Sequence, residues 1–238
     1  EAWSIRWYKN MIGDCSADVV SSTVPCSTKW MVGTVNSFYI GIIATVIATA
    51  LGTLAALGLS RPHMPYKGLI MAILISPMIV PLIITAAGMF FFYARINLVY
   101  TFTGVILAHV ALATPFVVIT VTATLVGFDM NMVKAAQSLG AKPLRTFFKV
   151  IMPLILPGII SGALFAFITS FDEVVIVMFM ASIDQLTIPK QMWAGIRQEI
   201  SPVILCMATC LVLLSIFLLT TVELLRRRSE KLRGIKAR

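Results

Sequence analysis

Five stretches of this chain are each long enough to cross a lipid bilayer as a helix and are almost free of charge. They are Thr34–Leu59, Leu69–Tyr93, Thr103–Gly127, Leu154–Met180 and Pro202–Leu225. Backbone groups in lipid need partners within the span, and the alternation of a barrel strand is absent, so we expect helices. Only 12% of the 238 residues are charged, too few for the surface of a soluble domain of this length. The sequence therefore predicts an all-α membrane protein with five transmembrane helices.

The basic residues indicate how these helices are oriented. Of the 19 lysines and arginines, 13 lie in 60–68, 128–153 and 226–238, and the other six lie in 1–33, 94–102 and 181–201. The positive-inside rule places the first set in the cytoplasm and the second outside. The net charge of +9 therefore reflects membrane orientation, and we expect no nucleic-acid partner. An outward N-terminal segment that begins at Glu1, without a signal-peptide pattern, leads us to expect a sixth transmembrane helix before residue 1.

The segment 129–153 contains the stretch KAAQSLGAKPLRTFFKVIMP, which has four basic residues and no acid. Asp129 is a suitable N-cap for a first helix, and Gly140 supplies its C-terminal stop. A second helix is expected from Pro143 to Pro153. An apolar stripe at helical spacing runs along the first helix and consists of Met132, Ala135, Ala136 and Leu139. We therefore predict a cytoplasmic helix–glycine–helix hairpin.

Three interpretations fit a short hairpin with one apolar side. It could lie on the anionic inner leaflet, pack onto the cytoplasmic face of its own bundle, or insert its first helix into a groove of a soluble partner. Two alanines at the centre of the stripe make that helix slim, which favours the groove.

Asp172 and Glu173 are the only acidic residues well inside a predicted span. A charge at that depth is costly, and no lysine or arginine lies in any span to pair with it. Three roles remain open: a structural hydrogen bond or protonation, a negative site on the pathway of a cationic substrate, and a proton relay. Ser170 and Phe171 precede the acids and offer a hydroxyl and an aromatic face for an ammonium group.

Catalytic and metal-binding chemistry is not indicated. The two histidines, His63 and His109, lie on different segments, and we expect His109 to be a packing residue. Cys206 and Cys210 have no histidine or carboxylate near them in sequence and are expected to pack as small apolar residues. A further pair, Cys15 and Cys26, could form a disulfide or remain free thiols. The phosphate-binding pattern GxxxxGK[ST] is absent from the sequence.

The hairpin resembles the EAA loop of type I ABC-importer permeases, a glutamate and two alanines followed at fixed spacing by glycine and proline. The matching residues here are Ala135, Ala136, Gly140, Val150, Met152 and Pro153. Lys134 stands where the family has glutamate, which implies a differently charged partner surface or a weaker contact. The double proline Pro77 and Pro81 and the stretch SFDEVV are similar to the permeases of spermidine/putrescine importers.

The resemblance implies a permease subunit that is not itself an enzyme and has no cofactor of its own. Its expected partners are an ATPase dimer that binds ATP and Mg, a sister permease or second copy, a periplasmic solute-binding protein and the lipid bilayer of a bacterial inner membrane. The coupling residues would be Lys134, Ala135, Ala136, Leu139 and Gly140. The expected substrate is a polyamine such as putrescine or spermidine, and the pathway residues would be Ser170, Phe171, Asp172 and Glu173.

Two alternatives remain: the same importer class for another nitrogenous or opine-like solute, and a stand-alone secondary transporter or channel. The expected organisation is an outward segment 1–33, a permease domain 34–225 and a basic cytoplasmic tail 226–238.

Overall fold

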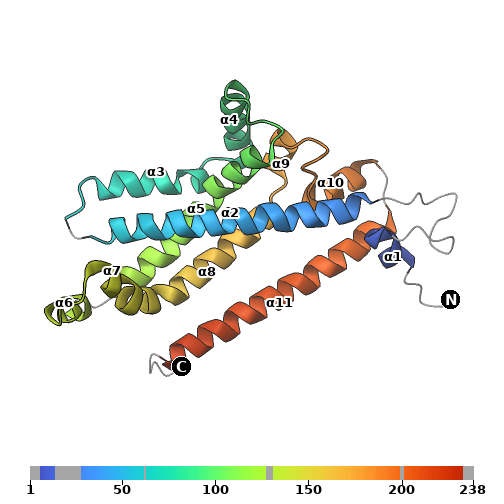
Figure 1. Ribbon diagram of the computed structural model, residues 1–238. Helices are drawn as coiled ribbons and strands as arrows, with labels where there is room; N and C mark the ends of the chain where they lie inside the picture. Colours follow the sequence, from blue (N-terminus) through green and yellow to red (C-terminus); the bar gives the residue numbers. More distant parts are fainter. Residues whose placement is uncertain (1–5, 14–27, 62, 127–130, 199–200, 233–238) are drawn as a thin grey trace. The chain divides into compact units, whose positions relative to one another are not determined.

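The computed structural model describes residues 6–13, 28–61, 63–126, 131–198 and 201–232. All regular elements within these residues are helical, which confirms the predicted all-α class (Figure 1). They are α1 Arg6–Ile12, α2 Lys29–Leu59, α3 Lys67–Ile79, α4 Leu82–Arg95, α5 Phe102–Val126, α6 Asn131–Ser138, α7 Pro143–Thr146, the π-helical turn η1 Phe147–Ile151, α8 Met152–Phe171, α9 Val175–Met180, α10 Ile188–Gln198 and α11 Pro202–Leu232.

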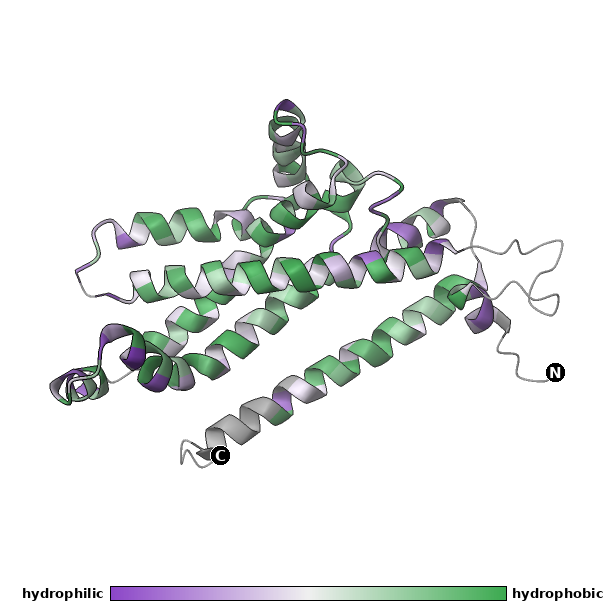
Figure 2. Ribbon diagram, viewed as in Figure 1, coloured by the Kyte–Doolittle hydropathy of each residue, from purple (hydrophilic) through white to green (hydrophobic). Residues whose placement is uncertain are grey.

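Among the described residues, four helical segments are long and apolar enough to cross a membrane, and α3 with α4 makes a fifth if that broken pair counts as one span. The four are Lys29–Leu59, Phe102–Val126, Pro143–Phe171 and Pro202–Thr221. Figure 2 shows hydrophobic residues along most of the length of these helices. The structure is therefore that of a multi-pass membrane protein.

The predicted second span, Leu69–Tyr93, is not a single kinked helix as the two prolines suggested. It breaks at Val80, which has an extended backbone with φ −72° and ψ 134°. Pro81 causes this break, because a proline disfavours the helical conformation in the residue before it. Pro77 stays inside α3, where the Ser76 hydroxyl donates a 2.8 Å hydrogen bond to the Ile73 carbonyl that Pro77 leaves without a donor.

The second helix of the hairpin does not end at Pro153 as predicted. One helical segment of 29 residues runs from Pro143 to Phe171. Within it, the Met152 N–H donates to the Phe147 carbonyl five residues earlier, which is the π-helical pattern. Pro153 is the next residue, and because it has no N–H it donates no hydrogen bond. The helix therefore changes from the π-helical back to the α-helical pattern at a residue without a donor.

The predicted fourth span, Leu154–Met180, was also wrong in its continuity. α8 ends at Phe171, and α9 begins at Val175 after a short non-helical segment. Asp172 and Glu173 therefore lie at a helix break, not within a continuous transmembrane helix.

The described chain forms two compact units, each assembled from separate stretches of sequence. In the unit made of 44–80, 110–169 and 222–238, glycines allow close helix contacts. A Cβ on Gly52 of α2 would lie 2.6 Å from the Val117 Cβ of α5, and a Cβ on Gly162 of α8 would lie 2.9 Å from the Val117 Cα. Small residues that let backbones approach closely are typical of membrane helix interfaces.

The other unit contains residues 1–43, 81–109 and 170–221. Its apolar cluster joins the start of α2 to α10 and α11 through Trp30, Ile188, Val203, Ile204 and Met207. The Asn36 side-chain amide of α2 donates hydrogen bonds of 2.8 and 2.9 Å to the Asp184 and Leu186 carbonyls. The loop before α10 is therefore fixed to α2 by side-chain hydrogen bonds.

Candidate functional site

α6 ends in the glycine turn that the sequence predicted. The Gly140 N–H donates to the Gln137 carbonyl at 2.9 Å, and the Ala141 N–H donates to the Ala136 carbonyl at 3.0 Å. This is the Schellman pattern, and Gly140 adopts the left-handed φ of +78° that it requires. The predicted N-cap, Asp129, lies outside the described residues.

Most of the apolar stripe of α6 is exposed, and only Ala136 of its four residues is half-buried. Leu139 is 89% exposed and Met132 is 50% exposed, while Val133, which is outside the stripe, is the buried residue of α6. Leu144 and Phe148 on the following helix are also exposed. With Met132 and Leu139 exposed, most of the stripe does not pack against the rest of the described chain.

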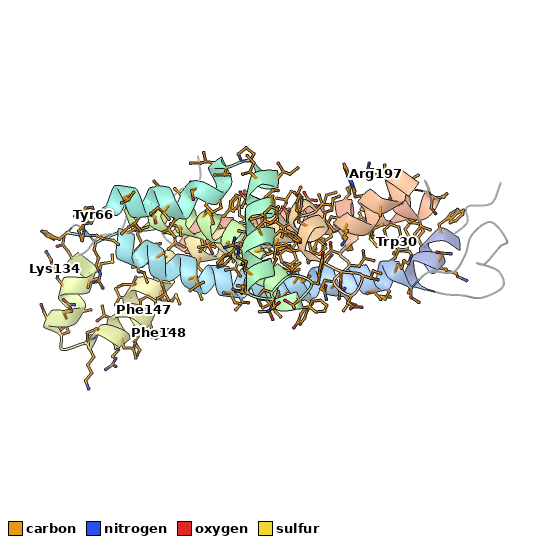
Figure 3. All side chains as sticks on the ribbon, turned by 90° about the horizontal axis from the view of Figure 1, so that it is seen from above. Trp30, Tyr66, Lys134, Phe147, Phe148 and Arg197 are labelled. Atoms are coloured by element: carbon orange, nitrogen blue, oxygen red, sulfur yellow. The ribbon has the colours of Figure 1, made fainter. Side chains whose placement is uncertain are left out.

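All four basic residues of the hairpin are exposed as well: Lys134, Lys142, Arg145 and Lys149. Figure 3 shows Lys134 on α6, with Phe147 and Phe148 on the helix that follows. Residues 131–153 of the hairpin thus present exposed leucines and a phenylalanine together with positive charge and no acid. Such a surface can bind an apolar groove with an acidic rim, or an anionic bilayer surface.

The helix break after α8 gives the two neighbouring acids different surroundings. Asp172 is exposed, whereas Glu173 is buried with 7% of its surface accessible. The Glu173 Oε1 atom accepts a 2.8 Å hydrogen bond from the Ile176 N–H in the first turn of α9. Glu173 is thus already bonded to backbone, while the Asp172 carboxylate is accessible.

Ser170 and Phe171, the other predicted pathway residues, contact neighbouring helices. The Ser170 Oγ lies 2.8 Å from the Nδ1 atom of His109 on α5, and both residues are buried. The Phe171 ring meets the Phe38 ring of α2 edge-on, with 5.1 Å between centroids. His109 therefore packs in the protein as expected, but its Nε2 atom has no hydrogen-bond partner among the described residues.

Helix positions show where along α2 and α5 the break lies. His109 comes seven residues after the start of α5 and Phe38 nine residues after the start of α2. At 1.5 Å per residue these positions are about 10 and 14 Å along their helices from the N-terminal ends. Ser170 and Phe171 contact these positions, so the break lies nearer the N-terminal than the C-terminal ends of α2 and α5.

Sequence reasoning missed Lys190 of α10. Its ammonium group donates to the Ala181 carbonyl at 2.8 Å and to the Val177 carbonyl at 3.4 Å, at the C-terminal end of α9. Burial lowers the pKa of Lys190 below its ordinary value. No local pattern in the sequence indicates this contact, because the partners lie nine and 13 residues away.

The arrangement favours a cation over an anion. The C-terminal end of a helix carries free carbonyl groups and a partial negative charge. α8 ends at Phe171, and the exposed Asp172 carboxylate follows at once. No group of three or more histidine, cysteine or acidic side chains that could hold a metal ion occurs among the residues with described positions.

Comparison with known proteins agrees with this architecture. Residues 28–231 match the family described as binding-protein-dependent transport system inner membrane component. The spermidine/putrescine transport system permease protein PotC of Haemophilus influenzae is 30% identical over 196 residues, 82% of this chain and 76% of PotC. The putrescine transport system permease protein PotI of Escherichia coli K12 is 30% identical over 215 residues, 87% of this chain and 72% of PotI.

A solved structure gives the same result at the level of fold. A chain of the MetNI methionine ABC transporter in an inward-facing conformation superposes with a TM-score of 0.66 and 18% identity, and covers 88% of this chain and 99% of that chain. The chain therefore belongs to the family of inner-membrane components of binding-protein-dependent transport systems, as the permease of a type I ABC importer.

Proposed function

We propose that this permease moves a small cationic solute of the polyamine class, such as putrescine or spermidine, into a bacterial cell across the inner membrane. The observation that carries the proposal is the exposed Asp172 carboxylate at the C-terminal end of α8. A polyamine carries several ammonium groups, and both the carboxylate and the helix end attract positive charge. The names of the relatives PotC and PotI point to the same class of solute.

A permease site needs to bind its solute weakly enough to release it. Asp172 supplies one charge, and the neighbouring Phe171 ring offers a cation–π contact. Ser170 is already hydrogen-bonded to His109, so its contribution is to fix the end of α8.

Transport would be driven by ATP bound with Mg on a partner ATPase dimer, because this chain lacks the phosphate-binding loop. The coupling contact would be the hairpin, through Lys134, Ala135, Ala136, Leu139 and Gly140. Its apolar stripe is exposed and available to a groove of the ATPase. A sister permease or second copy would complete the pathway, and an outer solute-binding protein would deliver the solute. If the chain worked as a stand-alone transporter or channel, the exposed stripe would have no soluble partner to bind.

Uptake of labelled putrescine by cells expressing the complete importer tests the cationic site. Asp172→Asn keeps the size of the side chain and removes its charge. A charged hydrogen bond contributes about 1.5–3 kcal/mol, so we expect the KM for putrescine to rise at least tenfold. Asp184→Asn is the matched control, because Asp184 is also exposed but lies on the outward loop. Unchanged putrescine uptake by Asp172→Asn would refute the cationic site and favour the opine-like alternative.

The same cells test the coupling contact. Ala135→Asp places a charge in the exposed stripe, and Gln137→Asp places the same charge on another side of α6. We expect Ala135→Asp to remain in the membrane but to lose both uptake and co-purification of the ATPase, while Gln137→Asp keeps both. Normal co-purification and uptake with Ala135→Asp would contradict docking through the stripe.

A further inference from the structure

We propose that Glu173 is a positioning residue that holds α9 in place and does not bind the transported solute. The inference rests on the proposed function, in which the neighbouring Asp172 meets the cation. It separates two adjacent acids of the same chemistry into one that contacts solute and one that acts through the protein backbone.

The N-terminal end of α9 depends on Glu173 for its cap. Val174 stands at the N-cap position and makes no side-chain capping hydrogen bond. The Ile176 N–H would lack a partner in the first turn, and Ile176 is fully buried, so water cannot readily replace one. The Glu173 Oε1 atom accepts this N–H at 2.8 Å, and its negative charge suits the positive end of the helix.

The C-terminal end of α9 is held by Lys190 in a complementary way. Its ammonium group donates to the Ala181 carbonyl at 2.8 Å, where positive charge suits the negative helix end. The Met180 carbonyl accepts a further hydrogen bond of 2.9 Å from the Tyr100 N–H. Because α9 has only six residues, it is too short to be stable without such contacts.

These contacts determine where Asp172 presents its carboxylate. Asp172 lies between Phe171, whose ring contacts Phe38, and Glu173, which is bonded to α9. With both neighbours fixed, the exposed carboxylate has little freedom to move. If α9 loses its cap, the segment that carries Asp172 loses one of its two anchors.

Two substitutions at Glu173 separate positioning from binding in the complete importer. Glu173→Gln keeps an oxygen that can accept the Ile176 N–H but has no charge, and Glu173→Leu removes the acceptor. We expect the putrescine KM of Glu173→Gln to stay within about threefold of the parent, and uptake by Glu173→Leu to fall at least tenfold. If Glu173 bound the cation, Glu173→Gln would raise the KM as Asp172→Asn does, and that result would overturn the proposal.

A labelling experiment reports on α9 without depending on transport. The four native cysteines are replaced by alanine, and Met180, which is fully buried, is replaced by cysteine. We expect an impermeant maleimide to label Met180→Cys slowly in the parent and in Glu173→Gln, and at least fivefold faster in Glu173→Leu and in Lys190→Met. Ile183→Cys, at a position that is 84% exposed, is the control and should label equally in all backgrounds.

The two measurements keep the proposals distinct. Slow labelling in Glu173→Leu would show that α9 does not need its cap and would refute positioning, whatever the substrate. Normal putrescine uptake by Asp172→Asn, together with fast labelling in Glu173→Leu, would refute the cationic site and leave the role of Glu173 in α9 intact. If Met180→Cys does not accumulate in the membrane, Val177→Cys gives the same comparison, because Val177 is also fully buried.

Discussion

The contact between α5 and α8 at Gly162 gives a prediction with a magnitude. A Cβ at this position would lie 2.9 Å from the Val117 Cα and would collide with the Thr120 hydroxyl. Ordinary contacts of a Cβ begin at 3.4 Å, so Gly162→Ala requires α5 and α8 to separate locally by about 0.5 Å or more. Neither obstacle can simply rotate away, because one is backbone and the Thr120 hydroxyl donates to the Phe116 carbonyl at 2.9 Å.

Three contributions determine how much Gly162→Ala changes the free energy of unfolding. Overpacking costs about 1–3 kcal/mol, and disturbing the Thr120 hydrogen bond costs about 0.5–1.5 kcal/mol. Replacing glycine by alanine inside a helix returns about 1 kcal/mol. We therefore expect Gly162→Ala to lower the free energy of unfolding by about 0.5–3.5 kcal/mol.

Thermal unfolding of the purified importer in detergent measures this loss. Gly58→Ala in α2 is the matched control, because a Cβ there would meet nothing within 4 Å. We expect the control to keep or raise the midpoint of unfolding and Gly162→Ala to lower it. Equal midpoints for the two variants would refute the close contact between α5 and α8.

Two further predictions concern orientation and the outward loop. A cysteine at position 183 should react with an impermeant reagent in sealed cells. A cysteine at position 139, or within the 226–238 tail, should react only after permeabilisation. A tail cysteine that reacts from outside would overturn the predicted orientation. Asn36→Ala removes the side chain that donates to two carbonyls of the loop before α10. We expect it to lower the free energy of unfolding by about 1–3 kcal/mol. An unchanged unfolding midpoint would show that water replaces these hydrogen bonds.

Hydropathy predicted most of the fold, because the bilayer imposes length and apolarity on every span. The two prolines show where this reasoning stops. Pro77 and Pro81 look alike in sequence, yet only Pro81 breaks the helix. Before Pro77, the Ser76 hydroxyl donates to the Ile73 carbonyl, which Pro77 leaves without an N–H donor. Before Pro81, Val80 adopts an extended backbone and the helix ends.

The candidate site was only partly predictable for a similar reason. Asp172 and Glu173 interrupt the apolar run, but residues 174–180 are apolar again, so hydropathy does not distinguish a helix break from a continuous span that carries two acids. Without that break, Asp172 and Glu173 are chemically equivalent neighbours. Lys190 was missed because its contacts are with backbone carbonyls, which carry no sequence signal. The glycine turn at Gly140 was predictable because its requirement is local.

The π-helical turn Phe147–Ile151 sets the rotation, about the helix axis, of the hairpin residues before it relative to the span that follows. A π-helical turn holds one residue more than an α-helical turn, and one residue corresponds to about 100° of rotation about the helix axis. The side of the helix on which Leu144 projects is therefore set by that single extra residue. Deleting one residue of the turn would leave the helix continuous and apolar but would aim Leu144 about a quarter of a turn away. The direction in which the hairpin presents Leu144 thus depends on the number of residues in this turn as much as on their identity.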